Sequence, residues 1–230
     1  MTPRIESICL IAALLLGAAA STLGWHGDAF AQEHANSSRP RGDIVLVRGG
    51  FNIFSEGLDS IAGKLARRGI AARLYRHRQG SQIVDSILEN QKRYGKHPII
   101  LIGHSWGANR ILNVARILSG HGLKVRYVVT IAATNPSPAS RNIQKLTNYY
   151  FKHNGWGEPV EAAVGFRGSL TNVDMSTTAE VHHFNVDDYP QLQSQIINNV
   201  VRLLRAKKVT QRMSGKRVAH SAAVGTMPEG

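Results

Sequence analysis

The chain has 230 residues, of which 43% are hydrophobic and 19% charged, with one Cys and a formal net charge of +13 at pH 7. This length suits one domain with a sizeable core, and the apolar content is too high for a wholly disordered chain. A single Cys excludes an intramolecular disulfide, a cysteine-rich zinc site and an iron–sulfur cluster.

Residues 1–31 are predicted to be a secretory signal peptide. A positive charge at Arg4 precedes the apolar run 8–20, and Ala29-Phe30-Ala31 offers small residues at the two positions that a signal peptidase reads. The run is short for a membrane-spanning helix, so an uncleaved anchor is the weaker alternative and no transmembrane span is expected after cleavage. We therefore expect an exported protein, either periplasmic or secreted.

Residues 32–42 are polar and are interpreted as a linker, and residues 43–205 are interpreted as the folded domain. Four short apolar runs are typical of strands buried on both faces of a parallel sheet. They cover residues 43–47, 70–75, 98–103 and 125–132. Apolar residues at helical spacing lie between these runs, near residues 58–66, 83–94 and 108–118. The alternation predicts an α/β fold with a mostly parallel sheet and helices on both faces.

The second half of the chain is less regular. Two further strands are expected at residues 146–151 and 169–173, and residues 191–204 have the spacing of a last amphipathic helix. Residues 206–230 contain five Lys or Arg and one Glu among Gly, Ser and Pro. This composition favours a flexible basic tail.

One motif indicates chemistry. Gly103-His104-Ser105-Trp106-Gly107 follows the third predicted strand and precedes a helix. The G-x-S-x-G pattern alone has low specificity, but the strand–turn–helix setting makes Ser105 a candidate nucleophile. A sharp turn there would project the hydroxyl above the sheet, and the following helix would direct its amides and dipole at a reacting carbonyl. A purely structural turn is the alternative.

With this motif third in the strand series, the sequence resembles the α/β-hydrolase superfamily, within its small lipase, esterase and thioesterase branches. The resemblance covers about residues 43–204. It implies the α/β-hydrolase fold, a serine nucleophile, a histidine base, an acidic partner and an oxyanion hole, and it requires no metal or cofactor. The family's lid insertion would span only about residues 133–145, so a minimal lid is expected.

The resemblance implies two backbone amides for the oxyanion hole. One belongs to Trp106, which follows the candidate nucleophile, and the other to Phe51 in the loop after the first strand. Gly50 is the close alternative to Phe51, and Gly49 stands where the family usually has a His. A plain glycine-rich turn is the other interpretation of this loop.

The resemblance places the base after the final strand, where His182 and His183 lie just before a Val-Asp pair. The family's register selects His183, with His182 as the alternative. The acid that orients the imidazole is expected at Asp174, while Asn154 and Glu158 stay open as alternatives.

Two further acidic residues follow the histidine pair. Asp187 and Asp188 are interpreted as a cap of the terminal helix or as its lead-in turn.

These residues predict a serine hydrolase that cleaves a carboxylic ester or thioester, small or polymer-borne, through an acyl-enzyme on Ser105. The positive charge favours an anionic substrate or an anionic envelope surface, and no nucleic-acid-binding motif is found. Two alternatives stay open. One is an acyltransferase that uses the same serine, and the other is a non-catalytic exported binding protein on a hydrolase scaffold.

Overall fold

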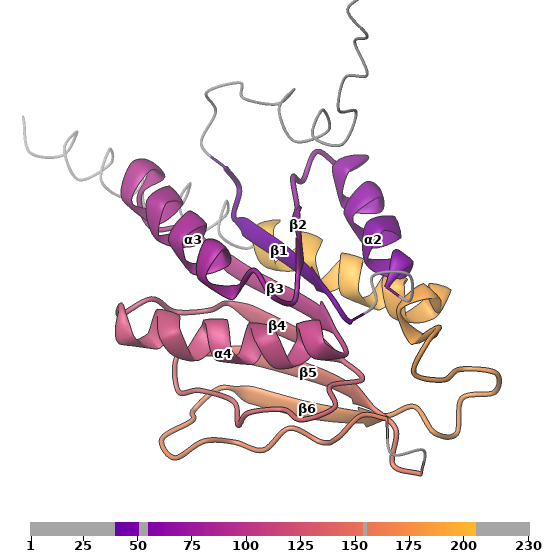
Figure 1. The fold of residues 1–230 in the computed structure, drawn as a ribbon. Coiled ribbons are helices and arrows are strands. Elements are labelled where there is room, and N and C mark those ends of the chain that lie inside the picture. Colours follow the sequence, from indigo (N-terminus) through magenta and orange to yellow (C-terminus); the bar gives the residue numbers. More distant parts are fainter. Residues whose placement is uncertain (1–39, 51–54, 154–155, 206–230) are drawn as a thin grey trace, which may run out of the picture. The chain divides into compact units, whose positions relative to one another are not determined.

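Within the residues that the computed structural model describes, six parallel strands form a single sheet in the order β2-β1-β3-β4-β5-β6 (Figure 1). The strands are β1 Asp43–Arg48, β2 Arg73–Arg76, β3 Ile99–His104, β4 Tyr127–Ile131, β5 Lys145–Tyr150 and β6 Ser169–Asp174. The structure describes residues 40–50, 55–153 and 156–205. The predicted signal peptide, most of the predicted linker and the predicted basic tail lie outside these ranges.

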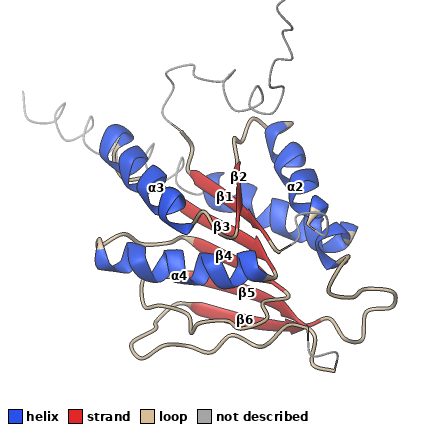
Figure 2. Ribbon diagram, in the orientation of Figure 1, coloured by secondary structure: helices blue, strands red, loops and turns tan. Residues whose placement is uncertain are grey.

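Helices cover both faces of the sheet (Figure 2). They are α2 Glu56–Ala66, α3 Gly80–Tyr94, α4 Trp106–Gly120 and a last helix over residues 190–205, which is preceded by a 3₁₀ turn at Val186–Asp188. The predicted fold class, an α/β fold with a parallel sheet and helices on both faces, is confirmed. No helix within the described ranges is both long and apolar enough to cross a membrane.

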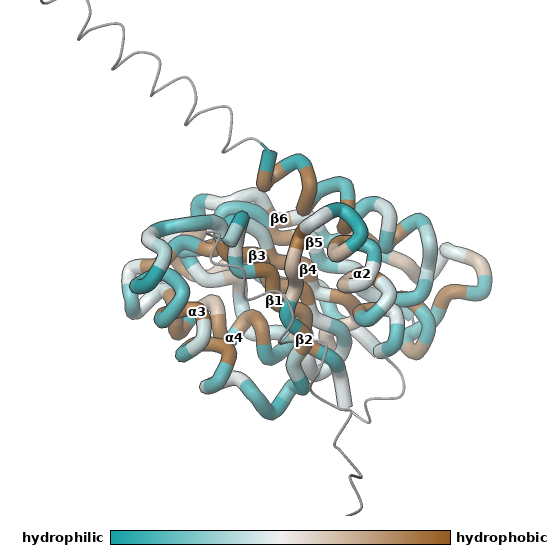
Figure 3. The backbone as a smooth tube through the Cα atoms, turned by 90° about the horizontal axis from the view of Figure 1, so that it is seen from above, coloured by the Kyte–Doolittle hydropathy of each residue, from teal (hydrophilic) through white to brown (hydrophobic). Residues whose placement is uncertain are grey.

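The strands are buried on both sides, and each side has its own hydrophobic core. All residues of β3 and of β4 are buried, and Figure 3 shows these strands as hydrophobic. One core joins the sheet to α2 and the last helix, through residues that include Ile44, Leu46, Leu58, Ile61, Ile102, Leu192 and Ile196. The other core joins it to α3 and α4, through residues that include Val45, Val47, Ile83, Ile87, Leu101, Ile111 and Leu112. Each fully buried Leu or Ile contributes about 2 kcal/mol to folding.

The strand order reverses at β1. From β1 the chain goes to β2 on one side and then crosses to β3 on the other, so the loops that follow β1 and β3 leave the sheet in opposite directions. Such a switch point at the carboxyl ends of the strands is where open α/β sheets bind their ligands. Ser105 follows β3 directly and therefore lies at this switch point.

The structure corrects the predicted start of the second strand. Strand β2 begins at Arg73, although Ile70 was expected to open it. Gly69, with φ of 67°, lies in the turn that follows α2, and the Ile70 amide donates to the carbonyl of Leu65 at 3.1 Å. Ile70 is therefore the apolar residue of a helix C-cap, and its buried side chain packs into the core from there.

Both strands expected in the irregular stretch are present as β5 and β6. The connection between β4 and β5, residues 132–144, contains no helix. The part of the chain where the family's lid would be inserted is thus short and irregular.

Candidate active site

The turn at Ser105 is strained. Ser105 has φ of 55° and ψ of −122°, between the last residue of β3 and the first residue of α4. A non-glycine residue in such a conformation costs on the order of 1–3 kcal/mol. The amide of Ser105 donates to the carbonyl of Ile131 at 2.8 Å, and the Ser105 carbonyl accepts from the Ala108 amide at 2.9 Å. The sheet and the helix together hold the turn in place.

The two glycines of the motif are required by close backbone contacts. A Cβ atom on Gly103 would lie 2.6 Å from the carbonyl carbon of Gly107, and one on Gly107 would lie 2.0 Å from the carbonyl oxygen of Val47. No side chain fits at either position without moving backbone. The pattern therefore lets α4 start directly against β1 and β3.

His183 lies beside Ser105. Its Nε2 atom is 3.1 Å from the Ser105 hydroxyl oxygen, although 78 residues separate the two in sequence. His183 follows β6 and precedes the 3₁₀ turn, and only 5% of its surface is exposed. Burial lowers the pKa of His183 below its usual value of 6.5, which keeps the imidazole neutral near pH 7; the Trp156 carbonyl opposes this shift.

The other ring nitrogen determines the tautomer of His183. Its Nδ1 atom is 3.2 Å from the backbone carbonyl oxygen of Trp156. A carbonyl oxygen accepts hydrogen bonds and cannot donate them, so Nδ1 carries the proton. Nε2 is then unprotonated and accepts from the Ser105 hydroxyl. This arrangement is the one that a general base needs.

The two residues after Trp156 are held in place by contacts with the residues that follow β4. Gly157, with φ of 134°, packs so closely that a Cβ atom there would lie 3.1 Å from the Cα atom of Ala132, and the Glu158 amide donates to the carbonyl of Ala133 at 2.8 Å. The Trp156 indole lies 5.0 Å from the His183 ring, between ring centroids. Trp156 therefore contacts the imidazole both through its carbonyl and through its ring.

The structure does not bring Asp174, the predicted acid, to His183. Asp174 is the last residue of β6, and its Oδ1 atom accepts from the amides of Ser176 at 2.9 Å and Lys152 at 3.3 Å. These backbone amides, Ser176 first, lower the pKa of the Asp174 carboxyl. Asp174 thus connects the turn after β5 to the end of β6. Of the two alternatives, Glu158 is exposed, and Asn154 lies outside the described residues.

The predicted oxyanion-hole residues are described only in part. Trp106 is the first residue of α4, so its amide lies at the positive end of the helix dipole. Its ring is 46% exposed and packs edge-on to His77, with centroids 5.2 Å apart. Phe51 lies outside the described residues. A Cβ atom on Gly50 would lie 2.9 Å from the Trp106 ring, so a side chain there would have to displace this ring.

A buried polar chain connects the loop after β1 to the loop that carries His183. The Gly49 amide donates to the Ser55 hydroxyl oxygen at 3.1 Å, and that hydroxyl lies 2.9 Å from Nδ1 of His104. Nε2 of His104 lies 2.8 Å from the carbonyl oxygen of His183. Because this carbonyl only accepts, Nε2 of His104 carries the proton and Nδ1 accepts from Ser55. Burial lowers the pKa of His104 to about 4, so this ring is neutral.

Asp187 lies beside His104, in the middle of this polar chain. Asp187 is fully buried, and its Oδ1 atom lies 3.9 Å from Nδ1 of His104. Neither of its carboxyl oxygens has a hydrogen-bond partner within the described ranges. Burial raises the pKa of Asp187 to about 7, and the charge of Asp188 adds to this rise. The amides of Gly57 and Leu58 oppose the shift without reaching hydrogen-bond geometry. Asp187 belongs to the 3₁₀ turn that leads into the last helix, as predicted for this pair of acids.

Two features of the site could not be predicted from the sequence. The partner of the base is a main-chain carbonyl, and every residue has one, so no side-chain pattern marks Trp156. His104 lies inside the recognised motif, but a lone His is most often structural, and its bond to the His183 carbonyl joins segments 79 residues apart. Within the described ranges, no cluster of His, Cys, Asp and Glu could hold a metal ion.

Comparisons with known proteins add a weak structural likeness. No family model matches the sequence, and no curated protein matches it significantly. Among solved structures, the chain is similar to a protein of Xanthomonas campestris pv. campestris that is named as a candidate hydrolase of the alpha/beta superfamily. The two are 14% identical over 70% of this chain and 98% of that one, with a TM-score of 0.42. This likeness is too low to transfer a reaction from one protein to the other.

Proposed function

We propose that this protein is a serine hydrolase that cleaves carboxylic ester or thioester bonds, with Ser105 as nucleophile and His183 as base. One observation carries the proposal: Nε2 of His183 lies 3.1 Å from the hydroxyl of a serine in a strained strand-to-helix turn. The Trp156 carbonyl holds the imidazole in the tautomer that accepts the serine proton. The motif's resemblance to the α/β-hydrolase superfamily agrees with this chemistry.

The first half of the reaction forms an acyl-enzyme. The Ser105 oxygen attacks the carbonyl carbon of the substrate while its proton passes to Nε2 of His183. In this proposal the amide of Trp106, at the start of α4, stabilises the resulting oxyanion together with a second amide from the loop after β1. As the intermediate collapses, His183 returns the proton to the leaving alcohol or thiol.

Water completes the cycle. The water oxygen attacks the acyl carbon while His183 takes a proton from the water. His183 then gives this proton to the Ser105 oxygen as the free acid departs. In both halves the imidazolium is transient, and its Nδ1–H donates to the Trp156 carbonyl. A neutral carbonyl stabilises this cation less than a carboxylate does, so we propose a Ser–His dyad oriented by main chain.

Exposed aromatic rings beside the dyad suit an acyl group. Trp106, Trp156 and Phe184 are 46%, 51% and 44% exposed, and the Trp156 and Phe184 ring centroids lie 5.7 Å apart. Such rings supply apolar contact area for a bound chain. Because residues 132–144 are too few for a large helical lid, we propose an open site for short or medium acyl groups, free or borne on a polymer.

Export and an anionic setting complete the proposal. The predicted signal peptide supports a location in the periplasm or outside the cell. Its net charge of +13 favours anionic envelope surfaces near the substrate.

Labelling with a fluorophosphonate probe tests the nucleophile. We expect the wild-type protein and His182→Ala, the matched control, to be labelled, and Ser105→Ala and His183→Ala to be unlabelled. Hydrolysis of p-nitrophenyl esters should fall by about 10⁴-fold or more in the last two variants. A folded wild-type protein that takes no label would overturn the proposal and favour the non-catalytic binding protein.

A second measurement separates hydrolysis from acyl transfer, because the same acyl-enzyme can react with an alcohol in place of water. Reaction of p-nitrophenyl acetate in the presence of added glycerol should yield mainly acetate. Acetylglycerol as the main product at millimolar glycerol would assign the protein to the acyltransferases.

A further inference from the structure

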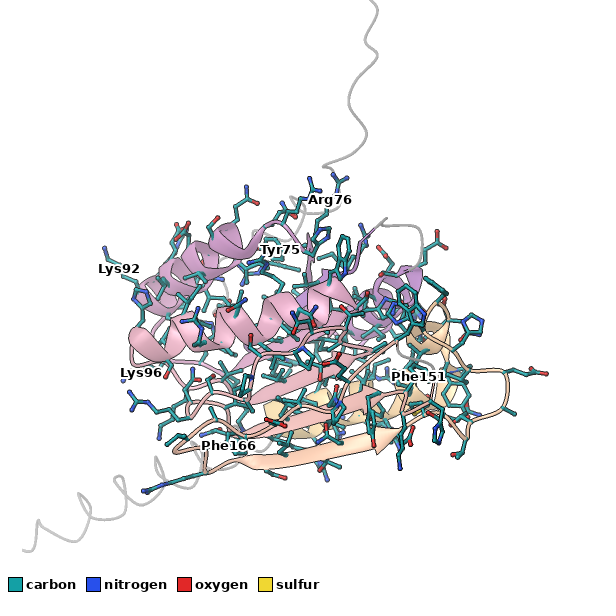
Figure 4. The ribbon with its side chains drawn as sticks, turned by 60° about the horizontal axis from the view of Figure 1, so that its bottom comes forward. Tyr75, Arg76, Lys92, Lys96, Phe151 and Phe166 are labelled. Atoms are coloured by element: carbon teal, nitrogen blue, oxygen red, sulfur yellow. The ribbon has the colours of Figure 1, made fainter. Side chains whose placement is uncertain are left out.

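Basic residues gather at the amino-terminal edge of the sheet, opposite the edge that carries Ser105. Because all six strands are parallel, the segments that precede them lie along one edge. Lys96 precedes β3, Arg126 precedes β4, Lys145 opens β5 and Arg167 precedes β6. Figure 4 labels Lys96 and Phe166 at this end of the sheet, and Phe166 is the residue before Arg167 in the sequence. The topology thus places one cation at the start of each of four neighbouring strands.

Two adjoining hollows run along this edge, with volumes of about 450 and 510 Å³. They share Lys124, Arg126, Gln144 and Leu203, and we call the pair the basic groove. Its cationic residues are Lys96, Lys124, Arg126, Arg141, Lys145 and Arg167. No Asp or Glu is found among the described residues that line it.

Ion pairs within the part of the chain that the structure describes do not neutralise most of the groove's charge. Elsewhere, Arg48 pairs with Asp59, and Arg73 with Asp43. Within the described ranges no recorded ion pair involves five of the groove cations: Lys124, Arg126, Arg141, Lys145 and Arg167.

The contacts that two of these cations make are with neutral groups. Arg126 donates to the amide oxygen of Gln144 at 3.2 Å, and Lys145 lies 5.3 Å from the centroid of the Tyr127 ring. Like charges held close together repel each other, and an anion placed between them relieves this repulsion.

We propose that the basic groove binds a flexible linear polyanion that bears phosphate or carboxylate groups along its chain. Neighbouring strands are about 4.8 Å apart, so the four strand starts spread cations over roughly 15 Å. Pro98, Ile99, Leu123 and Leu203 also line the groove and offer apolar contact to the uncharged parts of such a chain.

The shape and lining of the groove favour this partner over two others. The hollow is concave, whereas a lipid bilayer presents a flat surface. Single-stranded nucleic acids are usually held by bases stacked on aromatic side chains, and the described lining residues include no Phe, Tyr or Trp. Membrane and nucleic acid are therefore alternative outcomes of the test.

Binding of fluorescently labelled long-chain polyphosphate and of polygalacturonate to the full chain tests the proposal, with phosphates in one probe and carboxylates in the other. Affinity for at least one should fall steeply with salt. The triple variant Lys124→Gln/Arg126→Gln/Arg167→Gln should bind that probe at least tenfold more weakly. The matched variant Arg67→Gln/Lys92→Gln/Arg116→Gln, which removes the same charge from exposed sites, should stay within threefold of wild type.

Both variants retain the five Lys and Arg residues of segment 206–230, so any contribution of that segment to polyanion binding is the same in both. Equal weakening in both variants would overturn the proposal. So would binding to phosphatidylglycerol vesicles or to oligo-dT with neither soluble probe bound.

Hydrogen exchange of the wild-type protein tests the groove without a substitution. The bound probe should protect amides near residues 122–126, 141–145 and 166–168, and protection confined to other segments would contradict the assignment. Because neither measurement reads activity, the groove and the proposed Ser105 chemistry stand or fall separately.

Discussion

The Nδ1 atom of His183 faces the backbone carbonyl oxygen of Trp156 at 3.2 Å, while its Nε2 atom faces Ser105. A main-chain carbonyl therefore stands where serine hydrolases usually have a carboxylate. It fixes the tautomer and the ring orientation, which are two of the tasks of that carboxylate, but adds no full negative charge beside the imidazolium. We therefore expect the proposed reaction to need no carboxylate at His183, and substitution of Asp174 tests this expectation.

Replacement of Asp174 by Asn should change kcat/KM for p-nitrophenyl acetate by less than about fivefold. Its carboxylate bonds to the Lys152 and Ser176 amides, and an Asn oxygen can accept from both. Loss of a triad carboxylate, by contrast, typically costs about 10⁴-fold. A loss above 100-fold with an unchanged thermal midpoint would show that Asp174 does reach His183 during catalysis.

The activity should fall only at acidic pH, with a midpoint below the usual pKa of histidine. Burial lowers the pKa of His183 below 6.5, and the base works in its neutral form. Activity should therefore rise with pH through a midpoint below 6.5 and be nearly constant above pH 7.5. The profile of kcat/KM reports the free enzyme and is the measurement to make. A midpoint above 6.5 would indicate a negatively charged partner that stabilises the imidazolium.

His104 is expected to act as a positioning residue. His104→Leu removes the donor to the His183 carbonyl and the acceptor of the Ser55 hydroxyl, which should lower the free energy of unfolding by about 2–3 kcal/mol. It should also lower kcat about tenfold with little change in KM, because the base loses its support.

His104→Gln offers a conservative comparison, since its side-chain NH₂ can still donate to the His183 carbonyl. It should recover most of kcat while recovering less of the stability. Equal kcat values in the Leu and Gln variants would mean that the bond does not position the base.

Asp187 should make the protein less stable as the pH rises. Its pKa is raised from 3.8 to about 7 in the folded state, so unfolding releases a proton between these values. The stabilising effect of the neutral carboxyl is complete below pH 3.8 and is lost as the pH rises through 7. The slope is at most about 1.4 kcal/mol per pH unit, and the total loss is on the order of 2–4 kcal/mol.

Urea unfolding at pH 4.5, 6 and 8 measures this effect. The difference in stability between Asp187→Asn and wild type should shift in favour of the variant as the pH increases. Asp188→Asn, which alters an exposed neighbour, should keep most of the wild-type slope. A difference that is constant with pH would mean that Asp187 does not titrate in this range.

Strand and helix patterns predicted most of the fold because the sheet is buried on both faces. Runs such as residues 43–47 and 98–103 are apolar on both faces, so they are easily recognised as strands. Their predicted ends agree with the observed strand ends to within one residue. Strand β4 starts two residues later than predicted, and the largest difference is at β2, where Ile70 has the hydrophobicity of a strand residue but serves as the apolar contact of a helix C-cap. Local composition does not distinguish these two uses of a buried Ile.

The candidate site was predictable where it depends on side chains of a recognisable motif. Ser105 was identified from its motif and His183 from the register of the family that the sequence resembles, and the two lie within hydrogen-bond distance. Asp174 was chosen because it ends a strand nine residues before His183. Spacing could not show that the amides of the following turn bind its carboxylate, nor that His183 turns toward a carbonyl.

The basic groove and Ser105 lie at opposite ends of β3. Its six residues span about 20 Å at 3.3 Å per residue. A polymer held at one end would leave the other facing open solution, so the proposed enzyme would work as an immobilised catalyst and cleave small esters that diffuse past it. Salt would then release the protein from its support without altering its turnover.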